Sequence, residues 1–320
     1  MVRPVFGRKK KETVDVPSLI SLLFGAVTPE QNHLLHRIAH QAMERGHDPL
    51  RALILHTDQQ SLPSRIMVRF GPSDVEWCEV DGLHLATDVS EGSVSPQVAA
   101  GYEPHVTRTL RSLLGAGDTF VDVGANIGVH VAEAARIVGP HGRVVAVEPN
   151  SENCRLLLLT VDKNMFRNVT LVPTALSDRG EWTWFSTHIG SNGGVRTGET
   201  EALVQGFGSI VPVRRLDDVA PERTRLVKID VEGAEISVLR SGPETLRRDR
   251  PFVIMEFSCE MVRRVSDVDP LDALSWIEGL GYDIAVIRKG DGERIATSAQ
   301  DLIAGWPSPA NIEDLLLSPR

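Results

Sequence analysis

Cysteine is scarce in this sequence, and long apolar runs are absent. The three cysteines, Cys78, Cys154 and Cys259, lie far apart, so neither a disulfide framework nor a Cys-x-x-Cys metal site can be drawn from them. Reduced thiols are typical of an intracellular protein. No stretch reaches the roughly 18 consecutive apolar residues of a membrane-spanning helix, and no small-residue cleavage site of a secretory signal follows cleanly. We therefore expect a cytoplasmic protein.

An excess of positive charge is also missing. The chain has 34 Lys and Arg against 43 Asp and Glu, a formal net charge of −9. Binding to nucleic acid through a broad basic face needs clustered Lys and Arg, so no nucleic-acid partner is expected. One basic run, residues 8–11, precedes an apolar segment at 16–27. That order leaves open a peripheral membrane contact, beside the simpler interpretation of a solvated tail before a core helix.

What the sequence does contain is an alternation of strand and helix patterns from residue 118 onward. Seven strands are predicted, at 119–124, 142–149, 169–178, 225–231 and 251–257 and as a pair within 282–297 about the Asp291-Gly292 turn. Helical patterns separate the first five strands except for a helix-poor stretch at 181–224, and Ser151 is a candidate N-cap. This predicts an α/β fold with a mostly parallel sheet covered on both faces.

Residues 1–95 look different from the rest of the chain. Residues 18–60 have helical periodicity, and 75–89 predict a β-hairpin about Asp81-Gly82. His33, His36 and His40 share one helix face but lack an acidic or cysteine partner, so a metal site is not expected there. We predict a helical and hairpin extension at 1–95, acting as a cap or a dimer contact, and a catalytic domain at 96–320.

A glycine turn follows the first core strand. Asp122, Gly124 and Gly128 form a D-x-G-x-x-x-G pattern at a strand-to-helix junction, where a ligand can approach the backbone. The G-x-G-x-x-G spacing of a dinucleotide site is not met, and an aspartate here suits a ligand that carries an ammonium group. Glu148, at the end of the second strand, can accept two ribose hydroxyls. Together these features favour S-adenosylmethionine over NAD.

Several segments, in order, carry a more specific resemblance. The stretches VDVGANIG, VVAVEP, TALSD, RLDDV, LVKIDVEGAEISVLRSG and PFVIMEFS resemble the FkbM family of S-adenosylmethionine-dependent methyltransferases over roughly residues 100–318. GYEPHVTRTLRSLLGAGDTF resembles the family's lead-in, and ANIEDLLLSP its closing strand region. The resemblance implies a Rossmann-like class I methyltransferase fold. One departure is Thr160, where the family often has Asn, although Asn164 fits the later position.

The resemblance also implies a cofactor site. Asp122, Gly124, Asn126 and Gly128 would surround the methionine part, Glu148 would hold the ribose, and the ALSD segment would lie near the adenine. The candidate cofactor residues are therefore Asp122, Gly124, Ala125, Asn126, Gly128, Glu148, Pro149, Ala175, Leu176, Asp178 and Asp230.

Three residues are candidates for the chemistry of methyl transfer. Asp230, at the end of the fourth strand, can orient the cofactor's ammonium group or an acceptor hydroxyl, and Glu232 can act as general base, although a carboxylate favoured by a helix N-terminus is an equal alternative. His188 lies in a glycine-rich segment, 185–210, expected to be an acceptor-binding loop. Asp230 and Glu256 lack a clear third ligand, so no metal is predicted.

The class of methyl acceptor is limited mainly by motifs that the sequence lacks. The Asn/Asp-Pro-Pro-aromatic signature of amino methylation is missing after the fourth strand, and no Pro-Cys pair offers the covalent route to pyrimidine C5. The resemblance implies O-methylation of a sugar, glycolipid or polyketide hydroxyl. Three alternatives stay open. The protein is a methyltransferase of another acceptor class, such as nitrogen or RNA, a non-catalytic binding module, or an NAD-dependent oxidoreductase.

Overall fold

A computed structural model describes residues 75–88, 94–186, 194–196 and 209–320. Val75–Arg320 form one compact unit. The predicted N-terminal helices, the basic run, the three clustered histidines and His188 all lie outside the described residues. Within the described part of the chain, no helix is long and apolar enough to cross a membrane. The boundary predicted at 95/96 stays a prediction.

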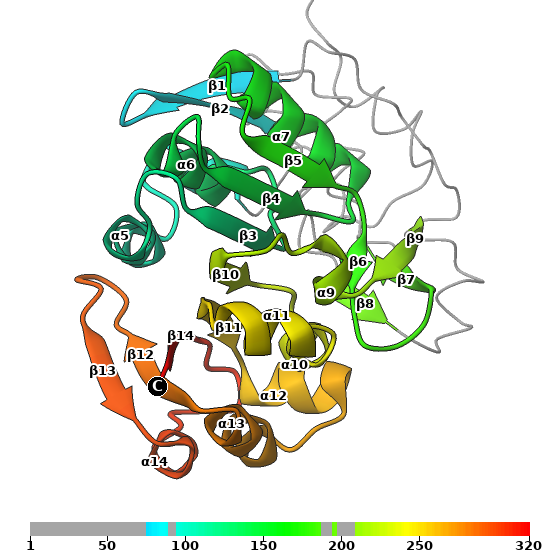
Figure 1. The fold of residues 1–320 in the computed structure, drawn as a ribbon, viewed down its shortest axis with the longest axis vertical. Helices are drawn as coiled ribbons and strands as arrows, with labels where there is room; N and C mark the ends of the chain where they lie inside the picture. Colours follow the sequence, from blue (N-terminus) through cyan, green and yellow to red (C-terminus); the bar gives the residue numbers. More distant parts are fainter. Residues whose placement is uncertain (1–74, 89–93, 187–193, 197–208) are drawn as a thin grey trace, which may run out of the picture. The chain divides into compact units, whose positions relative to one another are not determined.

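The main sheet confirms the predicted mostly parallel architecture (Figure 1). Its order is β13-β12-β14-β11-β10-β3-β4-β5. The parallel strands are β3 (Thr119–Val123), β4 (Arg143–Val147), β5 (Val169–Val172), β10 (Thr224–Ile229) and β11 (Phe252–Phe257). The antiparallel strands are β12 (Tyr282–Ile287), β13 (Arg294–Thr297) and β14 (Glu313–Pro319).

The strand count differs from the prediction in two places. The sheet has eight described strands rather than seven because β14 enters between β11 and β12; only the resemblance had suggested a strand there. The predicted strand at 169–178 divides into β5 and the short β6 (Ala175–Leu176), and β6 leaves the main sheet. There it joins β9 (Ser209–Arg214), β7 (Trp182–Ser186) and β8 (Gly194–Arg196) in the order β6-β9-β7-β8. The segment expected to be a loop at 185–210 therefore contributes to three strands.

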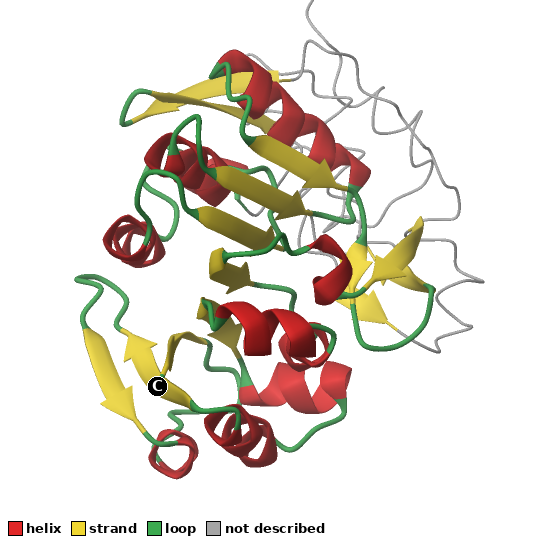
Figure 2. Ribbon diagram, viewed as in Figure 1, coloured by secondary structure: helices red, strands yellow, loops and turns green. Residues whose placement is uncertain are grey.

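Helices cover both faces of the main sheet (Figure 2). Strand residues alternate between the two faces: Phe120 belongs to the core with α5 (Pro104–Leu113), α6 (Val129–Val138) and α7 (Ser151–Lys163), whereas Val121 packs on the opposite side. The opposite face carries α9 (Leu216–Val219), α10 (Glu235–Arg240), α11 (Pro243–Asp249), α12 (Cys259–Met261), a π-helical turn (Val262–Ser266), α13 (Pro270–Gly279) and α14 (Ala299–Ala304). A short helix, α4 (Ser95–Val98), precedes α5.

The predicted hairpin is confirmed as β1 (Val75–Val80) paired with β2 (Leu83–Asp88). It docks on α7: the backbone N–H of Ala86 donates to Thr160 Oγ1 at 2.9 Å, and that of His84 donates to Asn164 Oδ1 at 3.0 Å. Thr160, the departure from the family pattern, thus has a structural role. The N-cap of α7 is Asn150 rather than the predicted Ser151, because the Asn150 side chain accepts the N–H of Glu152.

The order of the strands places a crevice between β3 and β10. The chain runs from β3 through β4 to β5 toward one edge, and from β10 to β11 toward the other. At such a switch point the loops that follow the two central strands diverge, which opens a ligand crevice at their carboxyl ends. The candidate residues from the glycine turn and from KIDVEGAE both lie at this position.

Candidate active site

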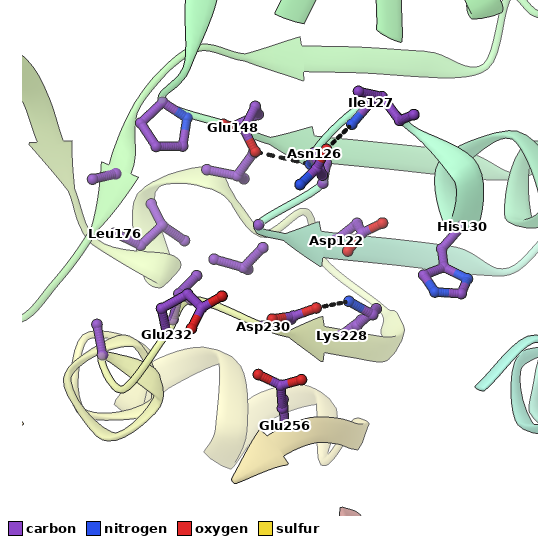
Figure 3. Close-up of a pocket in the computed structure, with 18 of the residues that line it drawn as sticks. Asp122, Asn126, Ile127, His130, Glu148, Leu176, Lys228, Asp230, Glu232 and Glu256 are labelled. Atoms are coloured by element: carbon purple, nitrogen blue, oxygen red, sulfur yellow. Dashed lines mark hydrogen bonds and ion pairs between the residues drawn. The ribbon is translucent and has the colours of Figure 1, made fainter. Parts of the chain in front are cut away.

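A cavity lies at the carboxyl ends of β3, β4, β10 and β11 (Figure 3). Most of the predicted site residues line it: Asp122, Gly124, Ala125, Asn126, Glu148, Pro149, Ala175, Leu176, Asp230 and Glu232. Gly128 and Asp178 are not among the lining residues. The structure therefore brings together residues that are as far apart in the sequence as Asp122, on β3, and Glu232, in the loop after β10.

The two glycines of the turn serve different contacts. Gly124 has a φ of +84°, and a Cβ built there would lie 1.9 Å from the carbonyl oxygen of Asp230. Gly128 has a φ of +90°, and its Cβ would lie 2.9 Å from Leu157 Cγ of α7. Gly124 thus lets the loop after β3 touch the loop after β10 across the crevice. Gly128 permits the packing of α6 on α7 instead of shaping the cavity wall.

Glu148 is fixed by the backbone around it. The N–H of Asn126 donates to its Oε2 at 2.8 Å, and the N–H of Asn150 donates to its Oε1 at 2.8 Å. The side chain of Asn153 approaches Oε1 at 3.4 Å. Burial nevertheless raises the pKa of Glu148 to about 7, although these donors oppose the shift. The carboxylate is positioned to accept hydroxyl groups from the cavity, and its charge changes near neutral pH.

Glu148→Gln is expected to weaken the binding of S-adenosylmethionine roughly 10- to 100-fold, since about 1.5–3 kcal/mol is typical for hydrogen bonds to a charged group. Because ribose hydroxyl groups would donate to the ionised form of this carboxyl group, the parent affinity should fall about tenfold from pH 8 to pH 6. Calorimetric titrations at both pH values test this. A parent affinity that does not change with pH, or a Glu148→Gln affinity that changes equally, would contradict the assignment.

A set of buried charged residues forms the floor of the cavity beside the glycine turn. Lys228 and Asp122 are register partners on β10 and β3, and Lys228 Nζ lies 2.9 Å from Asp230 Oδ2. Burial opposes the charge of Lys228, but the carboxylates around it raise its pKa above the ordinary value. Asp122 is 1% exposed, and its Oδ1 has no hydrogen-bond partner among the described residues. Burial raises the pKa of Asp122, while Lys228 opposes that shift.

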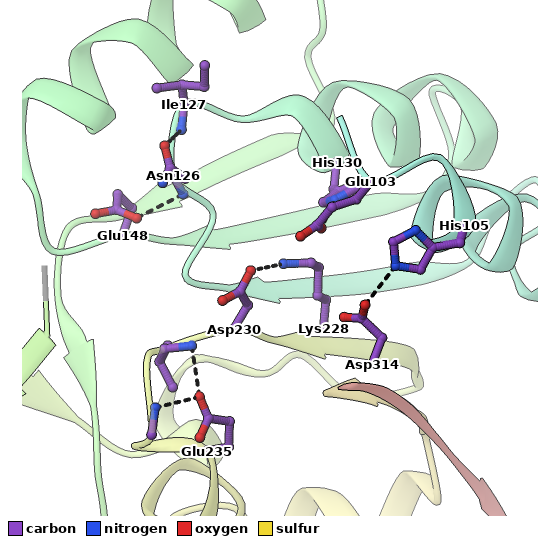
Figure 4. Close-up of polar contacts among 12 residues, drawn as sticks. Glu103, His105, Asn126, Ile127, His130, Glu148, Lys228, Asp230, Glu235 and Asp314 are labelled. Atoms are coloured by element: carbon purple, nitrogen blue, oxygen red, sulfur yellow. Dashed lines mark hydrogen bonds and ion pairs between the residues drawn. The ribbon is translucent and has the colours of Figure 1, made fainter. Parts of the chain in front are cut away.

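Residues ahead of the first core strand complete this group (Figure 4). Glu103 precedes α5, and its Oε2 lies 2.9 Å from Nε2 of His130 on α6. Burial opposes ionisation of Glu103, but His130 and Lys228 lower its pKa to about 2. Tyr102 and His130 both line the cavity, with ring centroids 5.7 Å apart. His130, Tyr102 and Glu103 were not among the site residues predicted from the sequence; the only signal for Tyr102 and Glu103 was the family-like lead-in GYEPH.

The acidic residues of the KIDVEGAE turn have two different positions: one stabilises the turn, and another faces the cavity. Glu235 Oε1 accepts the N–H groups of Val231 at 3.2 Å and Gly233 at 2.9 Å, so Glu235 holds the turn together. Glu232 lines the cavity from a left-handed backbone, with a φ of +54°. Burial, reinforced by Asp230, raises the pKa of Glu232. A non-glycine residue held in this conformation is strained, which is common where a side chain must face a ligand.

Glu232→Gly is expected to raise the free energy of unfolding by about 0.5–1 kcal/mol, since relief of the left-handed strain exceeds the entropy that glycine adds to the unfolded chain. Methyl transfer should fall by on the order of 100-fold if Glu232 is the base. The matched control is Met165→Gly, because Met165 is exposed with a φ of +57°. It should gain stability without losing activity. Unchanged turnover in Glu232→Gly would remove Glu232 from the chemistry.

Glu256, on β11, faces the same cavity. Carboxylate oxygens of Glu103, Asp230 and Glu256 all lie within 4.8 Å of one another. From the sequence, only Asp230 and Glu256 were considered as metal ligands, because Glu103 lies far upstream at the start of a helix. Burial and the charges of Asp230 and Glu232 raise the pKa of Glu256 to about 9. The absence of a metal from the predicted site stays a prediction.

Comparison with known proteins places the chain in a family. The Methyltransferase FkbM domain matches residues 122–284, just over half of the chain. No curated protein matches the sequence. Similar solved structures include the methyltransferase FkbM from Methylobacillus flagellatus KT, with 20% identity, a TM-score of 0.40, and coverage of 64% of this chain and 44% of that one. The chain thus spans less than half of that relative.

Two further structures are described with a bound cofactor. TYW2 from M. jannaschii in complex with AdoMet has 14% identity and a TM-score of 0.41, covering 78% of this chain and 87% of that one. Fibrillarin from Aeropyrum pernix with natively bound S-adenosyl-L-methionine has 15% identity and a TM-score of 0.36, covering 67% and 74%. It is the domain match, over the segment that carries the glycine turn, Glu148 and KIDVEGAE, that decides the family. The chain belongs to the FkbM methyltransferase family.

Proposed function

We propose that the protein is an S-adenosylmethionine-dependent O-methyltransferase that acts on a hydroxyl of a sugar, a glycolipid or a polyketide-type metabolite. The observation that carries this proposal is the cavity at the β3/β10 switch point, in which Glu148, Asp122 and Asp230 converge around the glycine turn. Family membership supports methyl transfer, and the absence of an amino-methylation signature favours oxygen as the acceptor atom.

The residues present fit this cofactor. Glu148 would accept the ribose hydroxyls, and the unpartnered Oδ1 of Asp122 offers a buried acceptor for the ammonium group. Ala175 and Leu176 provide apolar contact for a base. When bound, the cofactor supplies an electrophilic methyl group on sulfur. The chain's own contribution is to align an acceptor oxygen with that methyl group, exclude water and take up one proton.

The charge of the cavity bears on the acceptor class. Its lining includes five carboxyl side chains, Asp122, Glu148, Asp230, Glu232 and Glu256, but only Lys228 and His130 as basic side chains among the described residues. Both basic residues already contact carboxylates. A phosphodiester would meet repulsion here, which disfavours RNA, whereas a neutral, hydroxyl-rich acceptor would not.

Asp230 or Glu232 would take the proton of the acceptor hydroxyl. Asp230 has one oxygen held by Lys228, which leaves the other for the acceptor. His188 stays a candidate for acceptor binding, outside the described residues. We also propose that the enzyme is cytoplasmic, that it forms a homodimer, and that residues 8–27 make a peripheral membrane contact. Vesicle sedimentation with and without residues 1–27 tests the membrane contact.

The experiment that tests the function is an acceptor screen by mass spectrometry. The purified protein and S-adenosylmethionine are incubated with sugars, glycolipids and macrolides, with a parallel set of amines and short RNAs. A mass gain of one CH₂ on a hydroxyl acceptor, absent from reactions without enzyme, is the expected result. Methylation confined to the amine or RNA set would overturn the O-methyltransferase assignment, and so would cofactor binding without any transfer.

A further inference from the structure

The three clustered carboxyl groups of Glu103, Asp230 and Glu256 need compensation for their mutual repulsion. They come from three separate elements, the start of α5 and the ends of β10 and β11, and their oxygens lie within 4.8 Å of one another. A divalent cation or a shared proton can each provide that compensation. The contacts of the individual oxygens distinguish the two.

Two of the three carboxylates already have a nitrogen partner. Lys228 Nζ lies 2.9 Å from Asp230 Oδ2, and His130 Nε2 lies 2.9 Å from Glu103 Oε2. A cation between the carboxylates would meet the ammonium group of Lys228. A proton fits this environment better than a metal does.

Glu256 is the member that holds the proton. Its carboxyl group forms no hydrogen bond or ion pair with another described residue, and Figure 3 shows this group below the Lys228–Asp230 pair. Asp314, which pairs with His105 at 2.7 Å, adds negative charge from β14. Carboxylates this close cannot all ionise when Lys228 is the one lysine among them. Burial and these charges raise the pKa of Glu256 to about 9, in agreement with the geometry.

A second observation indicates that this end of the cavity receives a ligand. His130, which contacts Glu103 of this cluster, is more than nine-tenths buried and lines the same cavity, and its Nδ1 has no hydrogen-bond partner in the described part of the chain. Buried polar atoms of this kind usually find a partner when a ligand is bound.

We propose that Glu256 is an acceptor-binding residue that keeps its proton and donates it in a hydrogen bond to one oxygen of the acceptor, while Asp230 receives the proton of the neighbouring hydroxyl that is methylated. In the transfer, the hydroxyl oxygen forms the new C–O bond, the C–S bond of the donor breaks with its electron pair on sulfur, and the hydroxyl proton moves to Asp230. Two neighbouring oxygens are therefore recognised, as in the 1,2-diol of a sugar. This assignment rests on the proposed function.

The first test measures protonation without any acceptor, so it does not depend on the methyl-transfer assay. Melting temperatures of the parent, Glu256→Gln and the exposed control Glu260→Gln are compared from pH 5 to pH 9. A carboxyl group that stays protonated in the folded state costs stability as pH rises above its unfolded value. Glu256→Gln should match the parent near pH 5 and exceed it by about 5 °C or more at pH 9. Parallel curves for parent and Glu256→Gln would overturn the proposal.

Titration with MgCl₂ and MnCl₂ separates the proton from a metal. Neither salt should raise the melting temperature of the parent more than that of Glu256→Gln. A rise that the parent shows and Glu256→Gln lacks would indicate a metal site and overturn the proposal. Once an acceptor is known, Glu256→Leu should raise its KM about 100-fold or more and Glu256→Gln less than about tenfold, since glutamine keeps a donor. Equal KM changes would also overturn it.

Discussion

Alanine at position 124 is expected to abolish the binding of S-adenosylmethionine and to lower the free energy of unfolding by about 3 kcal/mol. The added Cβ would lie 1.9 Å from Asp230 O and 2.9 Å from its carbonyl carbon, so the loop after β10 must move. Overpacking of this kind costs about 1–3 kcal/mol, and the left-handed φ of +84° adds roughly 1 kcal/mol. The displaced loop is the one that holds Asp230 beside the cavity.

The matched control is Gly117→Ala. Gly117 has a similar φ of +87°, but nothing lies within 4 Å of its added Cβ. It should lose only the conformational contribution, about 1 kcal/mol, and keep its affinity for the cofactor. Chemical denaturation and calorimetric titration of both variants provide the measurements. If Gly124→Ala bound S-adenosylmethionine as tightly as Gly117→Ala, contact between the two loops would not shape the cofactor site.

Lys228→Met should destabilise the protein by about 3–5 kcal/mol at neutral pH, because it leaves the carboxylate of Asp230 in a buried site without its cation. The cost should shrink as pH falls, since protonation of Asp230 removes the uncompensated charge. Adding Asp230→Asn to Lys228→Met should recover part of the loss. Urea denaturation of the single and double variants at several pH values measures these effects.

Arg247→Met provides the comparison for the lysine variant. Arg247 pairs with Glu244 on the exposed surface of α11, so its loss should change stability little. A Lys228→Met protein as stable as Arg247→Met would mean that the cavity floor is hydrated and that Lys228 does not hold the carboxylates together. A double variant with the full loss of both single variants would exclude coupling between Lys228 and Asp230.

Strand periodicity and turn chemistry were sufficient to predict the parallel core and the meeting of Asp122, Glu148 and Asp230 at one cavity. Asp122, Glu148 and Asp230 end neighbouring strands, and the carboxyl ends of parallel strands meet at one edge of the sheet. The carboxylate of Glu148 accepts the backbone N–H groups of Asn126 and Asn150, which follow the neighbouring strands β3 and β4. Such features depend on residues close in sequence or on strand order, which the pattern of apolar residues shows.

The packing of α5 on α6 and the positions of β6 and β14 could not be predicted in the same way. The contact between Glu103 and His130 depends on how α5 packs against α6, and no periodicity specifies that angle. The break of the third strand at Val172 follows from the pairing of β6 with β9, whose partners are distant in sequence. β14 joins the sheet between two strands that precede it in the chain, so its position is shown by its antiparallel pairing with β11 and β12 and not by strand periodicity.

The most direct test of the central claim is calorimetric titration of the purified protein with S-adenosylmethionine, S-adenosylhomocysteine and NADH, repeated with Asp122→Asn. We predict that both sulfur ligands bind saturably to a single site and that NADH does not bind. The affinity of Asp122→Asn for S-adenosylmethionine should be at least about tenfold lower than that of the parent. Binding of NADH without binding of either sulfur ligand, or full affinity in Asp122→Asn, would contradict the account of this cavity as a methyl-donor site.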